Sequence, residues 1–291
     1  MEWKPKPWLA ALLGLLAPPI GMLYVQRPWW ALIYFFLATG LPVGVILAGG
    51  LGLANLSFLP PALSWAIAIA CAVHAHRIAS DAAPALDRSW YSRWYALASF
   101  VLVTVLVVVS VRSFLWEPYR IPGTSMYPTI PEGSFVVAEK RGFGHYGTYG
   151  FEPFRSKSTA QISRGDLIVF RLAEEPSMVY MKRVVAVPGD HIQYHERQMT
   201  LNGQRAALTF EGRDGPYQRA KETIDGRVTT VAFISDRPSK DYDERVPDNQ
   251  FVVFGDNRDN SRDSRYIGMV DRDAIIGRVV KVFASTSPTS D

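Results

Sequence analysis

A serine and a lysine in the second half of the chain have the types and contexts needed for nucleophilic chemistry. Ser125 lies in IPGTSMYPTIPEGS, where prolines and glycines on both sides restrict the backbone and would present the hydroxyl on a rigid loop. A serine hydroxyl is a poor nucleophile until a nearby base takes its proton. Lys182 could be that base, because the apolar run MVYMKRVVAVPGD would remove its amine from water and lower its pKa. A neutral amine can accept the serine proton and later give it to a leaving amine.

The histidines are weaker candidates for the base. His74 and His76 lie beside an apolar stretch, and His145, His191 and His195 lie in polar contexts without an obvious orienting carboxylate. A Ser/His/Asp triad therefore stays open as an alternative without support in the sequence.

A third polar segment, GDNRDNSRDSRYIG (residues 255–268), follows the strand-like run FVVF and could position the lysine from the opposite side. Its acidic residues invite a calcium-loop interpretation, but the glycine and terminal glutamate of an EF-hand loop are missing. We expect a hydrogen-bonded turn, no metal site and no cofactor. The tripeptide at 164–166 spells an adhesion motif, yet a turn leading into the strand LIVF explains it.

Composition limits the other functions. Cys71 is the only cysteine, so neither a disulfide nor a cysteine metal site is available within one chain. The net charge is +4 and the basic residues are scattered, which gives nucleic-acid binding little support. Hydrophobic residues make up 48% of the 291, and charges are scarce before about Arg112 but frequent after it. The chain is therefore expected to have two parts.

The first part contains four apolar stretches, to be judged against the roughly 20 residues needed to cross a bilayer. They run from Trp8 to Val25, Trp29 to Gly50, Leu59 to Val73 and Tyr95 to Val111. The second and fourth are the best candidates for spans, and Pro18-Pro19 makes the first a candidate re-entrant segment. Positive residues before the fourth stretch place that loop in the cytoplasm and Ser125 outside, close to the membrane.

The second part shows short strand-like runs separated by Gly, Pro, Asn and Asp, at 134–138, 166–170, 178–187, 228–234, 250–254 and 274–283. No long amphipathic helices separate them, so we expect a mainly antiparallel all-β domain. Polar residues from His191 to Asn249 predict an inserted smaller lobe with hairpins of its own. The segment GTYGFEPFRSKS, from Gly147, is expected to be an exposed loop whose aromatic residues could reach the membrane interface.

These observations predict a membrane α-helical N-terminal anchor followed by the antiparallel β domain. Residues 1–94 would be a multi-segment membrane region of unknown role, and 95–112 the transmembrane helix before the catalytic domain. Residues 113–291 would be an external catalytic domain, with the inserted lobe at about 191–249.

The segments SMYPT, RGDLIVF, MKRVVAVPGD and GDNRDNSRDSR resemble those of the type I signal peptidases, or leader peptidases, in order and spacing. The resemblance covers about residues 108–283. It implies Ser125 as nucleophile, Lys182 as base, Ser261 as the hydroxyl that orients the lysine, and Asp263 and Arg265 as supports. It also implies an oxyanion hole formed by the Ser125 backbone N–H, helped in some members by a hydroxyl at the position of Gly123. Thr124 or another backbone group could compensate for that glycine.

The resemblance further implies a substrate cleft and a cellular setting. The cleft would be walled by Tyr119, Ile121, Met126, Ile130, Tyr180 and Met181, and would accept small residues at the first and third positions before the cut. The implied enzyme is a serine endopeptidase of the cytoplasmic (inner) membrane of a bacterium, multi-pass, with its catalytic domain on the external or periplasmic side. It would remove signal peptides after Ala-x-Ala-like ends. Its partners would be secretory precursor proteins and the lipid bilayer, with the protein translocation machinery as a further candidate.

Two alternatives stay open. One is a related serine/lysine peptidase that matures a narrow set of clients. The other is a catalytically silent scaffold that binds precursors, against which the joint presence of Ser125, Lys182 and Ser261 argues.

Overall fold

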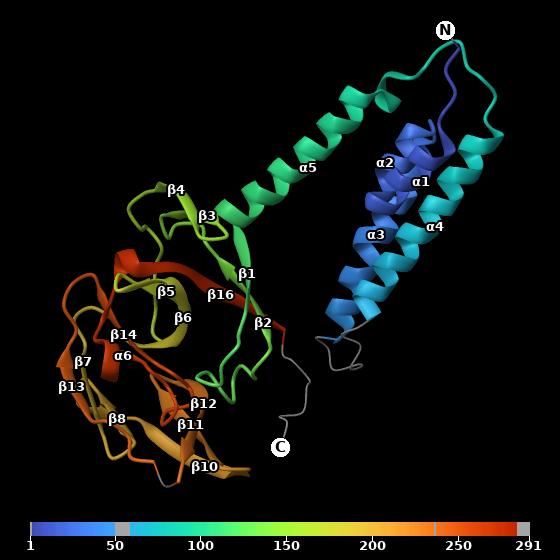
Figure 1. Cartoon of the computed structure of the whole chain (residues 1–291). Helices are drawn as coiled ribbons and strands as arrows, with labels where there is room; N and C mark the ends of the chain where they lie inside the picture. The colour runs from blue at the N-terminus through green and yellow to red at the C-terminus, as the bar shows by residue number, and fades with distance from the viewer. Residues whose placement is uncertain (1, 50–58, 236, 284–291) are drawn as a thin grey trace. The chain divides into compact units, whose positions relative to one another are not determined.

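The computed structural model describes residues 2–49, 59–235 and 237–283 (Figure 1). Side chains are not described for residues 42–49 or for residues 59 and 60. Contacts divide the chain into two compact units, Met1–Val107 and Val108–Asp291. Each unit is described by itself.

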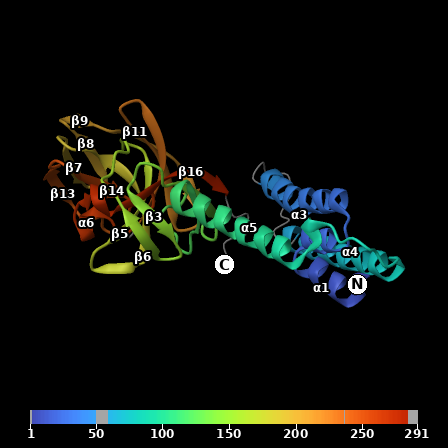
Figure 2. The same ribbon diagram turned by 90° about the horizontal axis from the view of Figure 1, so that it is seen from above.

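The first unit is helical. It consists of α1 (Pro7–Leu16), α2 (Pro18–Tyr24), α3 (Pro28–Gly49), α4 (Leu59–Asp81), the 3-10 turn η1 (Trp90–Ser92) and the first part of α5 (Trp94–Phe114). In the views of Figures 1 and 2, α1, α3 and α4 lie side by side, and contacts join α1 and α3 to α4. Each of the four apolar stretches of the sequence therefore forms helix, and only the first is interrupted within its described residues.

The first apolar stretch is broken into two helices. Ala17, the residue before Pro18, is extended with φ −152° and ψ 97°, as the clash with a following proline ring requires. The two short helices then fold back closely, because a Cβ on Gly21 would lie 2.5 Å from the Gly14 Cα. The third stretch instead continues as helix to Asp81, beyond the apolar run seen in the sequence.

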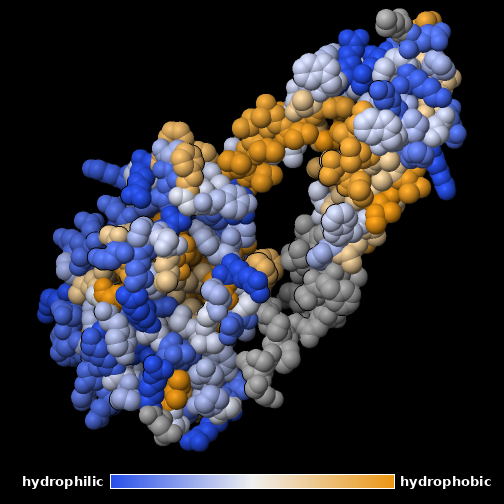
Figure 3. Space-filling model, viewed as in Figure 1, coloured by the Kyte–Doolittle hydropathy of each residue, from blue (hydrophilic) through white to orange (hydrophobic). Residues whose placement is uncertain are grey.

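Among the residues that the structure describes, two helices are long and apolar enough to cross a membrane, Pro61–Asp81 and Trp94–Phe114. The span expected at Trp29 to Gly50 is helical as α3, but only its part up to Leu41 has described side chains. Hydrophobic residues are concentrated along α5 in Figure 3, where the visible face of the β unit is largely hydrophilic. The apolar helices expected at the N-terminal end are present.

The second unit is built on a seven-stranded sheet with the order β1-β2-β16-β5-β6-β14-β15. All its neighbouring pairs are antiparallel. Its strands are β1 (Trp116–Arg120), β2 (Phe135–Glu139), β5 (Leu167–Leu172), β6 (Glu175–Ala186), β14 (Gln250–Phe254), β15 (Val270–Asp271) and β16 (Ile275–Phe283). The expected antiparallel β class is confirmed.

The strands between β6 and β14 form two smaller sheets. One has the order β13-β7-β8-β9 and the other β10-β11-β12. Their bounds are β7 (His191–His195), β8 (Gln198–Leu201), β9 (Gln204–Arg205), β10 (Ala207–Asp214), β11 (Tyr217–Ile224), β12 (Arg227–Ile234) and β13 (Tyr242–Arg245). Helix α6 (Ser264–Ile267) and the 3-10 turn η2 (Arg272–Ala274) follow β14.

The expectation of a loop from Gly147 is wrong, because this segment forms the hairpin β3 (His145–Thr148) and β4 (Phe151–Arg155). Tyr149 and Gly150 make its two-residue turn with φ of 54° and 81°, the left-handed pair that closes a tight hairpin. The sequence pattern hides the strand because Pro153, a poor strand residue, interrupts it.

Candidate active site

Ser125 lies on a loop that extends the β1–β2 hairpin. The base of the loop is closed by Ile121 N–H, which donates to Ser134 O at 2.9 Å, and by Gly133 N–H, which donates to Ile121 O at 2.8 Å. Within the loop, Tyr127 N–H donates to Thr124 O at 3.0 Å. These bonds fix the backbone on both sides of the serine.

Lys182 lies in the middle of β6, opposite Ile168 of β5, and is 4% exposed. Its Nζ is 2.8 Å from Ser125 Oγ and donates to the Met181 carbonyl at 3.0 Å. Burial lowers the pKa of the Lys182 amine to about 8, against the opposing effect of Asp263 and Asp256. At pH 7 about a tenth of such amines are neutral, roughly 200 times the fraction at an ordinary lysine pKa. This shift makes the lysine usable as a base.

The segment after β14 holds the serine loop from the other side. Asn257 N–H donates to Ser125 O at 3.1 Å, and the Asn257 side chain donates to Thr124 O at 3.1 Å. The Asn260 side chain donates to Thr124 Oγ1 at 3.0 Å. Gly255 permits this approach, since a Cβ there would lie 2.5 Å from Ser125 O.

Asp263 and Arg265 form a buried ion pair beneath this segment. Arg265 Nε donates to Asp263 Oδ1 at 2.8 Å, and the backbone N–H of Gly255 donates to Asp263 Oδ2 at 2.9 Å. Arg265 Nη2 also donates to Arg258 O at 2.5 Å. The pair therefore fixes the chain around the serine loop without touching the serine.

Ser261 packs closely against Gly255, because a Cβ on that glycine would lie 2.2 Å from Ser261 Oγ. The Ser261 hydroxyl is buried and has no hydrogen-bond partner within residues 2–49, 59–235 and 237–283. The hydrogen bond to Lys182 implied by the resemblance is thus not formed in this side-chain arrangement. A buried hydroxyl without a hydrogen-bond partner destabilises the folded state. The Ser261 hydroxyl is therefore available to bond with another group.

The same loop contains the backbone N–H and the open space that an oxyanion site would need. Within the described residues, the backbone N–H of Ser125 donates no hydrogen bond. A Cβ on Gly123 would meet no atom within 4 Å, so the space beside the N–H is open. The Thr124 hydroxyl accepts from Asn260 and is oriented by it. The backbone donor is therefore free, and Thr124 is already engaged.

A cleft of about 360 Å³ opens beside Ser125 and Lys182. Five of the six residues expected in a substrate cleft line it: Tyr119, Ile121, Met126, Tyr180 and Met181. The sixth, Ile130, is fully buried and packs with Met126 and Met181 in the core beneath. Arg262, to which the sequence pattern assigned no role, also lines the cleft and donates to Tyr180 OH at 3.0 Å.

The histidines of the β unit lie away from this cleft. Each nevertheless has a carboxylate partner that was not obvious in the sequence: His145 pairs with Glu152, His191 with Asp243 and His195 with Asp241. These partners lie 7 to 52 residues away along the chain, and strand pairing brings them together.

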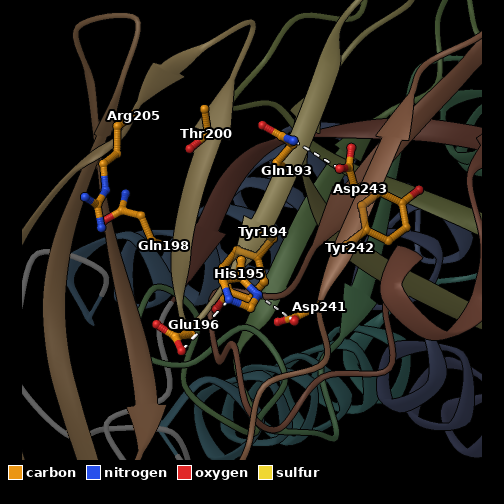
Figure 4. Close-up of a pocket in the computed structure, with 10 residues that line it drawn as sticks. All are labelled: Gln193, Tyr194, His195, Glu196, Gln198, Thr200, Arg205, Asp241, Tyr242 and Asp243. Atoms are coloured by element: carbon orange, nitrogen blue, oxygen red, sulfur yellow. Dashed lines mark hydrogen bonds and ion pairs between the residues drawn. The ribbon is translucent and has the colours of Figure 1, made fainter.

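A cavity larger than this cleft, about 740 Å³, lies over the sheet β13-β7-β8-β9 and not at Ser125 (Figure 4). In Figure 4 His195 points toward Asp241, and Gln193 toward Asp243. No serine lies among the residues that line this cavity. In the described part of the chain, no three His, Cys, Asp or Glu side chains gather as a metal site.

Several supporting contacts were not foreseen. Arg183, next to the lysine, forms two hydrogen bonds with Asp256, at 2.8 and 2.6 Å. Arg258 and Glu222 form a fully buried ion pair that joins the segment after β14 to β11. The DNR and DSR patterns marked the segment as polar, but nothing in the sequence identified Glu222 as a partner.

Comparison with known proteins assigns the chain to a family. A family model described as signal peptidase, peptidase S26, matches residues 94–284. The signal peptidase I of Pseudomonas fluorescens is 33% identical over 208 residues, 64% of this chain and 71% of that protein. That of Rickettsia typhi is 32% identical over 214 residues, 66% of this chain and 80% of that protein. A crystal structure of a signal peptidase I from Enterococcus faecalis V583 aligns at 21% identity over 41% of this chain and 97% of that chain, with a TM-score of 0.28, too low for a comparison of folds.

Proposed function

The chain belongs to the S26 family of signal peptidases, and we propose that it removes N-terminal signal peptides with Ser125 as nucleophile and Lys182 as general base. The distance of 2.8 Å between Lys182 Nζ and Ser125 Oγ, at a lysine held out of water, carries this proposal. Family membership supports the peptidase class, and the geometry supports this choice of residues.

In the proposed mechanism the neutral Lys182 amine takes the Ser125 proton as Oγ attacks the carbonyl carbon of the scissile bond. The negative charge that develops on the carbonyl oxygen would be stabilised by the free Ser125 N–H. The lysine ammonium then gives its proton to the leaving amine, which departs as the new N-terminus of the mature protein. Water attacks the remaining acyl-enzyme with Lys182 again as base, releasing the signal peptide and restoring the serine.

Three residues would hold this pair in place. Ser261, whose hydroxyl has no hydrogen-bond partner in the described part of the chain, would receive a hydrogen bond from the lysine amine. Asp263 and Arg265 would act one step further away, by fixing the backbone of Gly255. They are positioning residues in this scheme, because neither reaches the reacting atoms.

The proposed specificity is for small side chains at the first and third positions before the cut, as in Ala-x-Ala. The cleft offers apolar walls from Ile121, Met126 and Met181, and Tyr180 with Arg262 borders it. Ile130 would act from beneath, by supporting Met126. An extended substrate could add to a cleft strand, so that main-chain hydrogen bonds set its register.

We place the enzyme in a bacterial cytoplasmic (inner) membrane as a multi-pass protein. Residues 1–94 would be a membrane anchor, 95–112 the last span and 113–291 the external catalytic domain, with a lobe inserted at about 191–249. The apolar α4 and α5 and the homology to bacterial signal peptidases support this placement. Secretory precursors would reach the cleft while still held in the bilayer, with the translocation machinery as a further candidate partner.

The test compares wild type with Ser125→Ala and Lys182→Ala in proteoliposomes, following cleavage of a precursor with an Ala-x-Ala site by mass spectrometry. We expect wild type to cut after that site and both folded variants to be inert. Full activity of Lys182→Ala would refute the proposed base. Cleavage of only a few among varied precursors would favour a narrow client set, and an inert wild type would favour a scaffold.

A further inference from the structure

The hairpin β3–β4 exposes large aromatic side chains at its tip and along β4. Tyr149 is 81% exposed, Phe151 73% and Phe154 62%. Tyr149 forms the turn, and Phe151 and Phe154 belong to β4. On the face shown in Figure 3, hydrophobic residues also appear over this hairpin. Exposed apolar side chains that gather on one surface mark an interaction site.

The hairpin packs against the C-terminal end of α5. Phe114 stacks on Tyr146 of β3, with ring centroids 5.3 Å apart. Arg112 Nε donates to Thr148 Oγ1 at 3.1 Å, and the Arg112 guanidinium lies 4.3 Å from the Tyr149 ring centroid. The tip is therefore fixed beside the last turn of an apolar helix that is long enough to cross a bilayer.

A buried network ties this hairpin to the substrate cleft through Glu117. Thr148 Oγ1 donates to Glu117 Oε1 at 2.8 Å, and Lys140 Nζ donates to Glu117 Oε2 at 3.0 Å and to the Gly147 carbonyl. Tyr119, which lines the cleft, donates its hydroxyl to Glu117 Oε2 at 2.8 Å. The position of the hairpin and that of one cleft wall are thus coupled.

We infer that the β3–β4 hairpin is a second membrane contact, whose tip enters the headgroup region of the same bilayer that α5 crosses. Aromatic rings favour that region. The occupant is lipid, because the tip is adjacent to the end of α5. The inference rests on the proposed membrane placement of α5, and not on the peptidase chemistry.

The test places a fluorescent label at the tip of the full-length protein. In a Cys71→Ser background, Phe151→Cys is labelled with an environment-sensitive dye, and Phe210→Cys is the matched control. Phe210 is an aromatic residue of β10 that is 51% exposed. Both proteins are reconstituted into vesicles of phosphatidylethanolamine and phosphatidylglycerol, with nitroxide-bearing phospholipid or aqueous iodide as quencher.

We expect the label at 151 to emit at a shorter wavelength than the label at 210, to be quenched by the lipid nitroxide and to be shielded from iodide. The label at 210 should be quenched by iodide and not by the lipid nitroxide. Equal quenching at both positions would overturn the inference. Shielding at 151 from both quenchers would also overturn it, because protein and not lipid would then cover the tip. These readouts do not require cleavage, so they stay separate from the proposed peptidase function.

A second measurement tests the consequence for substrate access. We expect the triple variant Tyr149→Ser, Phe151→Ser and Phe154→Ser to cleave a membrane-inserted precursor several-fold more slowly than wild type, with unchanged cleavage of a soluble peptide. Phe210→Ser should change neither rate. An equal loss on both substrates, with an unchanged unfolding temperature, would show that the hairpin acts on the cleft directly and not through the membrane.

Discussion

The cavity over the sheet β13-β7-β8-β9 and the cleft beside Ser125 both hold polar side chains, but these differ in their exposure to water. The cavity over the sheet β13-β7-β8-β9 is about 740 Å³ and holds pairs such as His195 with Asp241, at 2.6 Å, both open to solvent. The cleft beside Ser125 is about 360 Å³ and borders one buried amine, that of Lys182. In the described part of the chain Lys182 forms no ion pair with a carboxylate.

This difference shows why volume and the number of charges are poor guides to reactivity. When a histidine and its carboxylate partner are both exposed, water solvates and screens the two groups, so their interaction is weak. The buried lysine loses its proton more readily than an ordinary lysine, and a hydroxyl lies within hydrogen-bond distance. Reactivity therefore depends on desolvation and on the nearest acceptor or donor.

The largest difference in rate should appear when the basic side chain of each hollow is replaced by an apolar one of similar size. Lys182→Met removes the amine from the cleft, and we expect the cleavage rate to fall by a factor of about 10³ or more, since general base catalysis is worth roughly 10²–10⁴. His195→Leu makes the matching change in the larger cavity and should leave the rate unchanged. Steady-state kinetics on a signal-peptide substrate measures both. A comparable loss in His195→Leu would remove the distinction between the two hollows.

The next effect concerns the space behind the serine. Gly255→Ala would place a methyl 2.2 Å from Ser261 Oγ and 2.5 Å from Ser125 O, so the serine loop must move. We expect about a hundredfold loss of kcat, as for misplacement of a reacting group by about 1 Å, with a loss in unfolding free energy of about 1–3 kcal/mol. Gly123→Ala is the control, because its Cβ meets nothing within 4 Å. If both variants behave alike, close packing at Gly255 does not position the nucleophile.

The pH dependence of the cleavage rate should be set by Lys182 of the cleft and not by His195 of the larger cavity. The neutral fraction of Lys182 rises about tenfold per pH unit below its pKa of about 8 and levels off above it, so kcat/KM should follow the same curve. A peptide substrate without titratable groups in this range isolates the enzyme's own ionisation. The His195→Leu profile should overlie that of wild type. A rate that keeps rising toward a pH of about 10.4, the ordinary lysine pKa, would show that burial does not shift the lysine.

A smaller effect is expected from Ser261, the hydroxyl without a partner in the described part of the chain. Ser261→Ala removes a group that in our proposal orients the lysine amine but leaves Lys182 buried, so we expect a loss of about tenfold in kcat with little change in KM. The pH profile of the variant should also shift, because in our proposal the Lys182 amine loses a hydrogen-bond acceptor. A role of Ser261 in packing alone would not produce this shift. An unchanged rate and profile would reduce Ser261 to a packing role.

The site shows which parts of this molecule could be predicted from its sequence. Ser125 and Lys182 are 57 residues apart, and the local sequence made each a candidate, but only four segments together, in the order and spacing of a known family, singled out the pair. Contacts that depend on strand register were missed. Glu222 meets Arg258, and His195 meets Asp241, because sheets bring distant residues together, and no local pattern encodes that meeting.

The fold follows the same division between local and distant effects. Strand runs with clear alternation or continuous apolar residues, such as β5 and β14, were predicted, whereas β1 and the β3–β4 hairpin were not. Pro118 in β1 and Pro153 in β4 interrupt the pattern, and pairing with β2 and β3 overrides that local preference. Ile130 was placed in the cleft by its position near Ser125, but the loop turns it into the core.

The smallest predicted effect would add a group to the cleft. Gly123 has open space at its Cβ and lies two residues before a free Ser125 N–H, so Gly123→Ser can place a hydroxyl donor near the developing oxyanion without displacing other atoms. We expect kcat to rise about threefold, well below the hundredfold or more that a fully aligned donor contributes, because a serine rotamer is not fixed in open space. Single-turnover rates compare it with Gly123→Ala, which has the same backbone restriction but no donor. A rise of equal size in both variants would assign the gain to the backbone and leave the oxyanion site of the cleft to Ser125 alone.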